Sequence, residues 1–219
     1  MRLKFAFFSL VIFASLLASA QLKLDKSAAF SDPAAPAKLR DALDPAGLRI
    51  LQSDGGVFCH IWLRKSLPAA TPAPADDIAY PDLAPGTMVG VMVLRIDGKD
   101  FRGQPVKAGT YTLRYALIPN DGNHLGVSPN RDFLLLVPIA SDPDPAARLD
   151  PQQVINLSKA VIGTNHPSPW SLLPMDKDKG DLPRLFENAD GFQVLAATLH
   201  LDSGKAIPFS LVVKGQAQQ

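Results

Sequence analysis

The chain has little cysteine, no run of charge of one sign and only one long apolar stretch. Cys59 is the single cysteine, which excludes a disulfide within the chain. We expect it to be a small buried side chain on a strand, with a reactive thiol or an intermolecular bridge as the alternative. The 22 Lys and Arg nearly balance the 21 Asp and Glu. This balance, with no basic run, argues against nucleic acid or an anionic membrane as a partner.

The one long apolar stretch lies at the beginning of the chain. Two cations precede fourteen residues, Phe5 to Ala18, that only two serines interrupt, and the segment closes on Ala18-Ser19-Ala20. Small residues at these positions are typical of a secretory signal peptide, here cleaved before Gln21. The stretch is too short to span a bilayer comfortably. We therefore predict that residues 1–20 are a signal peptide and that the protein is exported, periplasmic or secreted, with no transmembrane segment after cleavage.

The remaining 199 residues are enough for one hydrophobic core. Residues 21–47 are polar and rich in Ala and Pro, and we expect an N-terminal arm or a short helix there. In the helical alternative Asp32 is the N-cap and Pro33 the first helical residue. We predict that residues 48–215 form a single domain, followed by a polar tail at 216–219.

Short apolar segments bounded by turn residues recur through this domain and indicate β-strands. We expect strands at 48–51, 57–63, 87–96, 109–118, 133–139, 194–201 and 206–213. Segment 57–63 is apolar on both faces, as in a central strand, and Tyr111, Leu113 and Tyr115 share one face of another. The last two strands are expected to pair across the turn at 202–205.

One segment has clear helix signals, with Asp150 as N-cap, Pro151 as first helical residue and Gly163 at the end. Strands do not alternate with helices, and the chain has twenty prolines. The predicted fold class is therefore mainly β, an antiparallel β-sandwich with one or two short helices and long Pro-rich loops.

The segment Gly103-Gln-Pro-Val-Lys-Ala-Gly-Thr-Tyr-Thr-Leu113 has the form G-x-x-V-x-A-G-x-Y-x-L. It resembles the bacterial exported proteins grouped as domain of unknown function 2911, as does the final stretch, Leu199 to Leu211. The resemblance implies an exported β-sandwich of unassigned function and brings no catalytic residues. From the residues themselves we expect Gly109 to adopt a backbone conformation closed to other residues, and Tyr111 to place its ring in the core with its hydroxyl near the rim.

Four histidines lack the close spacing of a metal-binding motif, so we assign no metal and no cofactor. We expect His60 to lie in the core or just below the surface with its hydrogen bonds satisfied, and His200 to face solvent. Asp142 and Asp144 lack the glycine turn and distal Glu of an EF-hand, and we expect both to be surface carboxylates.

Two polar loops carry the best candidates for a site. One loop contributes Asn123, His124, Arg131 and Asp132; the other contributes Asn165, His166 and Trp170. If they lie at the same end of the sandwich, they form one ligand-binding surface. The leading hypothesis is a non-enzymatic binding or envelope-associated module whose partner is a protein, an envelope component or a small ligand. The alternative is a hydrolase or metal-assisted enzyme that uses His124 and His166.

Overall fold

A computed structural model describes residues 22–71, 77–119, 130–175 and 180–217. The predicted signal peptide at 1–20 lies outside the described residues, and so do two of the candidate site residues, Asn123 and His124.

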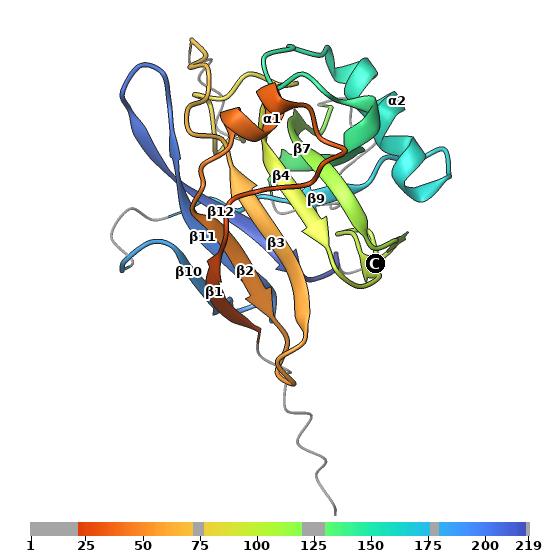
Figure 1. Cartoon of the computed structure of the whole chain (residues 1–219), viewed down its shortest axis with the longest axis vertical. Helices are drawn as coiled ribbons and strands as arrows, with labels where there is room; N and C mark the ends of the chain where they lie inside the picture. Colours follow the sequence, from red (N-terminus) through yellow and green to blue (C-terminus); the bar gives the residue numbers. More distant parts are fainter. Residues whose placement is uncertain (1–21, 72–76, 120–129, 176–179, 218–219) are drawn as a thin grey trace, which may run out of the picture.

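Seven antiparallel strands form the larger sheet, in the order β1-β2-β3-β4-β7-β8-β9 (Figure 1). In chain order they are β1 (Lys23–Ser27), β2 (Gly47–Leu51), β3 (Val57–Leu63), β4 (Met88–Leu94), β7 (Gly109–Leu117), β8 (Asp132–Pro138) and β9 (Pro169–Ser171). The strand expected at 57–63 is confirmed residue for residue. It lies between β2 and β4, as its two apolar faces predicted.

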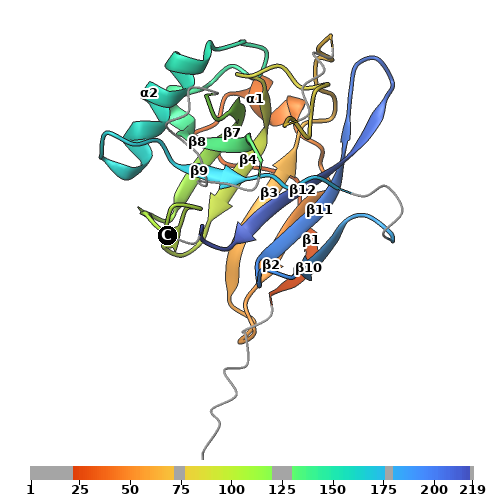
Figure 2. The ribbon, with the colours of Figure 1, turned by 180° about the vertical axis from the view of Figure 1, so that it is seen from behind.

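The smaller sheet lies across the inner face of the larger one (Figure 2). It contains β10 (Arg184–Glu187), β11 (Gln193–His200) and β12 (Ala206–Lys214), again antiparallel. The bridge between Leu172 and Leu211 connects the β9 side of the larger sheet to β12. β5 (Gly98–Lys99) and β6 (Pro105–Val106) form a separate short hairpin. Strands make up 41% of the structure and helices 12%, so the mainly-β prediction is confirmed.

The main core fills the space between the two sheets. Tyr111, Leu113 and Tyr115 of β7 point into it together, as their alternation predicted, and they meet Leu195 and Phe209 of the smaller sheet. Cys59 is fully buried there, and burial raises the pKa of its thiol. The prediction of a small buried side chain is confirmed.

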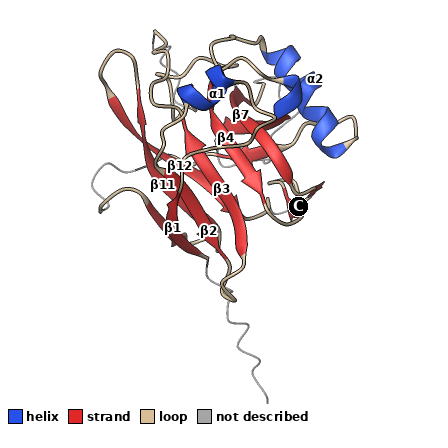
Figure 3. Cartoon of the chain, in the orientation of Figure 1, coloured by secondary structure: helices blue, strands red, loops and turns tan. Residues whose placement is uncertain are grey.

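Two helices cover the outer face of the larger sheet (Figure 3). Leu39 of α1 (Ala37–Ala42) packs in a cluster with Trp62 of β3, and Val154 of α2 (Pro151–Ile162) packs in one with Leu135 of β8. A short 3-10 helix, η1 (Ile139–Ser141), lies between β8 and α2.

The ends of α2 are those that the sequence predicted. The Asp150 side chain accepts a hydrogen bond from the backbone N–H of Gln153, and the Gln153 side chain accepts one from the backbone N–H of Asp150. This reciprocal pair is a capping box. The helix ends at Gly163, whose φ of 72° is readily available only to glycine.

The first helix begins later than predicted. Its N-cap is Pro36, whereas Asp32 stands in a turn where its carboxylate accepts a hydrogen bond from the backbone N–H of Ala34. A proline disfavours helical conformation in the residue before it, so Pro36 keeps Ala35 out of a helix. The N-terminal segment is also more than an arm, because β1 pairs with β2 along its whole length.

The expectation for Gly109 was wrong, while that for Tyr111 holds. Gly109 is not among the glycines of positive φ in the described chain; in the same motif it is Gly103 that has a φ of 80°. Gly109 instead leaves room for the Tyr111 side chain, since a Cβ at Gly109 would lie 3.0 Å from the Tyr111 hydroxyl. That hydroxyl donates a hydrogen bond to the carbonyl of Lys107, and the ring is buried.

The expectation that Asp142 is a surface carboxylate was also wrong. It is 3% exposed and pairs with Arg114, which is fully buried on the outer face of β7. Arg114 Nε and Nη2 donate to the two carboxylate oxygens at 2.8 and 2.5 Å, and Thr112 Oγ1 donates to the same carboxylate. The remaining Arg114 N–H groups donate to the carbonyls of Gly86, Ala147 and Asp144. Every N–H of this guanidinium therefore has a partner.

Candidate functional site

Asp132 supports the fold from the start of β8. It is fully buried, and its carboxylate accepts hydrogen bonds from the backbone N–H groups of Ala79 and Tyr80, at 2.8 and 3.0 Å, and from the Tyr115 hydroxyl at 2.6 Å. Burial raises the pKa of Tyr80 to about 12 and raises that of Tyr115 further. Both phenols therefore remain hydrogen-bond donors, and Asp132 anchors the segment around Tyr80 to the sheet.

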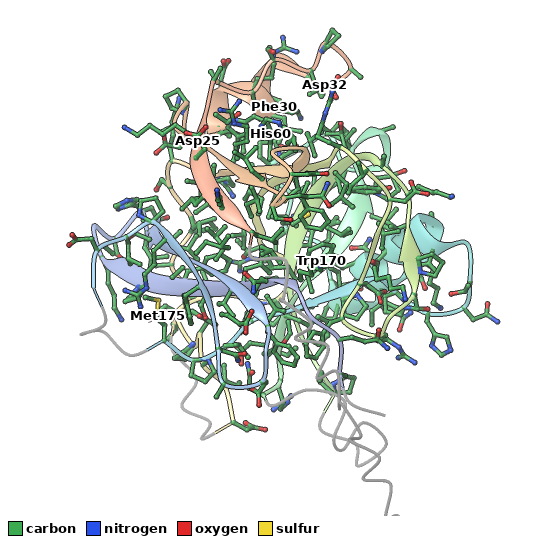
Figure 4. All side chains as sticks on the ribbon, turned by 90° about the horizontal axis from the view of Figure 1, so that it is seen from below. Asp25, Phe30, Asp32, His60, Trp170 and Met175 are labelled. Atoms are coloured by element: carbon green, nitrogen blue, oxygen red, sulfur yellow. The ribbon has the colours of Figure 1, made fainter. Side chains whose placement is uncertain are left out.

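Two further candidates also have their contacts within the protein. Arg131 donates from Nε to the carbonyl of Ile118 at 2.7 Å and from Nη1 to the carboxylate of Asp77 at 3.1 Å. Trp170, on β9, is 2% exposed and lies in the interior, near the middle of the view in Figure 4. The tryptophan therefore belongs to the main core.

The remaining described candidates, Asn165 and His166, are exposed and lie together at a cavity of about 330 Å³. This volume is at the lower end of the range of small-molecule pockets. The cavity lies between α2 and the outer face of β7 and β8, close to β9. Of the five candidates that the structure describes, these are the two that it brings to a common cavity.

The floor and wall of the cavity are apolar. Ala116 of β7 and Phe133 and Leu135 of β8 come from the outer face of the sheet, and Ile155 comes from α2. Phe101, from the turn between β5 and β6, closes one side, because its backbone N–H donates to the carbonyl of Pro169 on β9. An apolar body placed here would contact rigid elements on both sides.

Two side chains of the cavity, Lys159 and Arg102, carry positive charge. Lys159 and Arg102 line it beside His166, and no Asp or Glu of the described chain does so. Neither cation forms an ion pair with another described residue. The cavity therefore combines an apolar floor with cationic groups and has no carboxylate in its described lining, while the charge of Asp100 acts on Arg102 from outside it.

Sequence reasoning missed Lys159 and Arg102. A signal for Lys159 was present, because it lies four residues after Ile155 and so on the same face of α2. Arg102 carried no comparable signal, since it reaches the cavity only through the docking of the β5–β6 turn against β9.

His60 is a partnered histidine, as predicted. Its Nδ1 lies 2.8 Å from Ser27 Oγ, and its ring stacks on Trp62 with 5.5 Å between ring centroids. His200 is exposed, which also agrees with the prediction. Throughout the described ranges, no three His, Cys, Asp or Glu side chains gather closely enough to hold a metal ion.

Neither described helix is long and apolar enough to cross a membrane. No protein-family model, curated protein or solved structure matches this chain. The resemblance to domain of unknown function 2911 therefore stays a prediction, and the case for function rests on the geometry of the site.

Proposed function

We propose that the protein is a binding module that holds a small molecule with an apolar body and an anionic group in the cavity under α2. The observation that carries the proposal is the charge pattern of that cavity, in which Lys159, Arg102 and His166 surround an apolar floor without a carboxylate among the described lining residues. Apolar walls with a few placed polar groups are usual in ligand sites.

The two parts of such a ligand have separate roles. Contact with Phe133, Leu135 and Ile155 removes apolar surface from water, at about 25 cal/mol per Å². An anionic group near Lys159 and Arg102 gains a charge-assisted hydrogen bond, and such bonds are stronger than neutral ones. A cationic group at the same place would be repelled.

Calorimetric titration with octanoate, octanol and octylammonium tests this function, because the three share one apolar chain and differ in charge. We expect octanoate to bind most tightly and octylammonium most weakly. Lys159→Met keeps much of the side chain's length and removes its charge, and it should weaken octanoate binding roughly tenfold, or about 1.4 kcal/mol. Lys23→Met, at an exposed position on β1, is the matched control.

A second variant tests the location. Ile155→Trp places a larger side chain at the half-buried cavity wall and should weaken binding of all three compounds. Equal affinities for octanoate and octylammonium, or octanoate affinity that neither variant alters, would contradict the proposed function.

The proposed setting of this function is outside the cytoplasm, as the N-terminal segment at 1–20 suggests. The alternative enzyme would need His124, which lies outside the described residues. Of His124 and His166, the structure describes only His166, which is exposed at the cavity. Its backbone N–H donates a hydrogen bond to Thr164 Oγ1. No contact of the described chain adds support for catalysis, so binding is the function we put forward.

A further inference from the structure

A second cavity, of about 410 Å³, shares no lining residue with the one under α2. It lies where β3 ends, β4 begins and the turn between β11 and β12 approaches the segment after η1. Arg64 follows β3, Thr87 precedes β4, Arg148 belongs to the segment after η1, and Asp202 belongs to the turn.

Two polar groups of this cavity are buried without a partner. Arg64 Nε and Thr87 Oγ1 have no hydrogen-bond partner among the described residues, and Thr87 is only 3% exposed. Buried polar atoms are nearly always paired, so an unpaired one calls for an explanation such as an absent ion or water. Here two such atoms belong to residues that line the same cavity.

The Arg64 side chain is held in place. Its Nη1 donates to the carbonyl of Pro145 at 3.0 Å and, more weakly, to that of Met88 at 3.4 Å. These bonds fix the plane of the guanidinium without using Nε. The group is therefore positioned in advance for a further acceptor.

The charges near this cavity favour an anion. Arg64 and Arg148 line it, and neither forms an ion pair with another residue in the described part of the chain. Burial, and then the positive charge of Arg114, lowers the pKa of Arg64. A guanidinium nevertheless stays protonated in a protein. Arg114 is already neutralised by Asp142, whereas Asp202 acts on Arg64 through its charge without forming an ion pair with it among the described residues.

We propose that this cavity binds a phosphate group, with Arg64 Nε, Arg148 and the Thr87 hydroxyl as its donors. The guanidinium fork suits the oxygen spacing of phosphate and carboxylate groups. This site is independent of the ligand that we propose for the cavity under α2.

Asp202 makes the choice of oxyanion more specific. It lines the same cavity, and its charge acts on Arg64. One of its oxygens accepts from the backbone N–H of Ala69 at 2.9 Å, so the carboxylate can take further donors but can supply none. A phosphate that retains a proton can donate to Asp202, whereas sulfate has no proton to donate and is repelled by that carboxylate.

Titration calorimetry of the protein with inorganic phosphate, glycerol phosphate and sulfate tests the site, at about pH 6, where phosphate groups are partly protonated. We expect phosphate to bind at least tenfold more tightly than sulfate. If glycerol phosphate binds as tightly as inorganic phosphate, the phosphate group in the cavity can come from a phosphate monoester. If glycerol phosphate does not bind, the ligand is free phosphate. Either result supports the site.

Two variants, each with a control, separate binding from folding. Thr87→Val should weaken phosphate binding about fivefold without lowering the melting temperature, because the hydroxyl has no partner to lose. Thr198→Val, on β11 away from this cavity, is its control. Arg148→Gln should weaken phosphate binding, whereas Arg102→Gln, in the cavity under α2, should leave it unchanged.

Asp202→Asn tests the selectivity, because it keeps the oxygen that accepts from Ala69 and removes the charge. Sulfate binding should then approach phosphate binding. The proposal is overturned if neither phosphate compound binds the wild-type protein, if Thr87→Val binds phosphate as the wild type does, or if sulfate and phosphate bind the wild type equally.

Discussion

At the scale of single residues, buried charge is where sequence reasoning was most misleading. Asp142 precedes Pro143 in a proline-rich segment that resembles a surface loop, and Arg114 belongs to an alternating strand. Both are buried because the loop after η1 folds over the outer face of β7. Their partners are distant in the sequence, and no local pattern indicates them. A buried pair is tolerated only when its hydrogen bonds are satisfied, as they are here.

His60 offers a residue-scale prediction about pH. Burial, with smaller contributions from the positive charges of Arg95 and Arg49, lowers the pKa of this histidine from its ordinary value of 6.5. The unfolded chain therefore binds the proton more readily than the folded one. The contribution of His60 to stability is complete above pH 6.5 and is lost as the pH falls from there toward the lowered pKa.

Unfolding by urea at a series of pH values between about 5 and 8 would measure this effect. His60→Gln, which retains a polar group near Ser27, should make the free energy of unfolding depend less on pH below 6.5. His200→Gln, at an exposed histidine, is the matched control for the substitution itself. An unchanged slope in His60→Gln would show that this histidine titrates alike in both states.

At the scale of elements, β7 is the strand whose face most clearly fills the core. Leu113 is fully buried between the sheets, so Leu113→Ala should lower the free energy of unfolding by about 2–5 kcal/mol. Ile96→Ala truncates a side chain that is 39% exposed and should cost much less. The denaturant midpoints of the two variants measure the difference in their free energy of unfolding, when both free energies depend equally on denaturant concentration. Equal midpoints would place Leu113 outside the cooperative core.

The elements that could be predicted are those that local chemistry determines. The strand at 57–63 was predicted from its apolar run, and both ends of α2 were predicted from Asp150, Pro151 and Gly163. The start of α1 was missed because two prolines compete to begin that helix, and burial of Ala35 in a turn supports the second. β1 was missed because four of its five residues are polar and it is held by pairing with β2.

The site was less predictable than the fold, because its residues come together through contacts between distant parts of the chain. Asn165 and His166 were found because they stand in a polar loop, and they do line a cavity. Trp170, only four residues further along, enters the core because β9 begins at Pro169. Arg102 depends on how distant turns dock, which local composition does not encode. The second cavity, lined by Arg64 and Thr87, likewise joins residues from four separate parts of the chain.

At the scale of the whole molecule, the two cavities use different features of one architecture. The cavity under α2 exists because a helix covers an apolar sheet face incompletely, leaving Phe133 and Ile155 half-buried. The second exists because loops from both sheets meet at Arg64 without giving its Nε a partner. Leu67 of the main core lines the second cavity, but the side chains proposed to hold the ligands, such as Lys159 and Thr87, lie outside that core, so ligand affinity can be altered while the core residues are unchanged.

Export is the prediction that concerns the chain as a whole. The segment Ala18-Ser19-Ala20 predicts cleavage before Gln21. Leu22, the next residue, is 6% exposed and belongs to the main core, and β1 follows directly. Cleavage there would therefore leave every described contact in place.

N-terminal sequencing of protein recovered outside the cytoplasm should find Gln21 as the first residue. Ala20→Leu places a large side chain at the position that requires a small one, and should block cleavage. Ser19→Leu changes the position between the two small residues, where the requirement is relaxed, and should be processed like the wild type. Wild-type protein that is recovered outside the cytoplasm with Met1 still attached would contradict the prediction. Leu22 and β1 would then begin a domain whose N-terminal segment is retained after export.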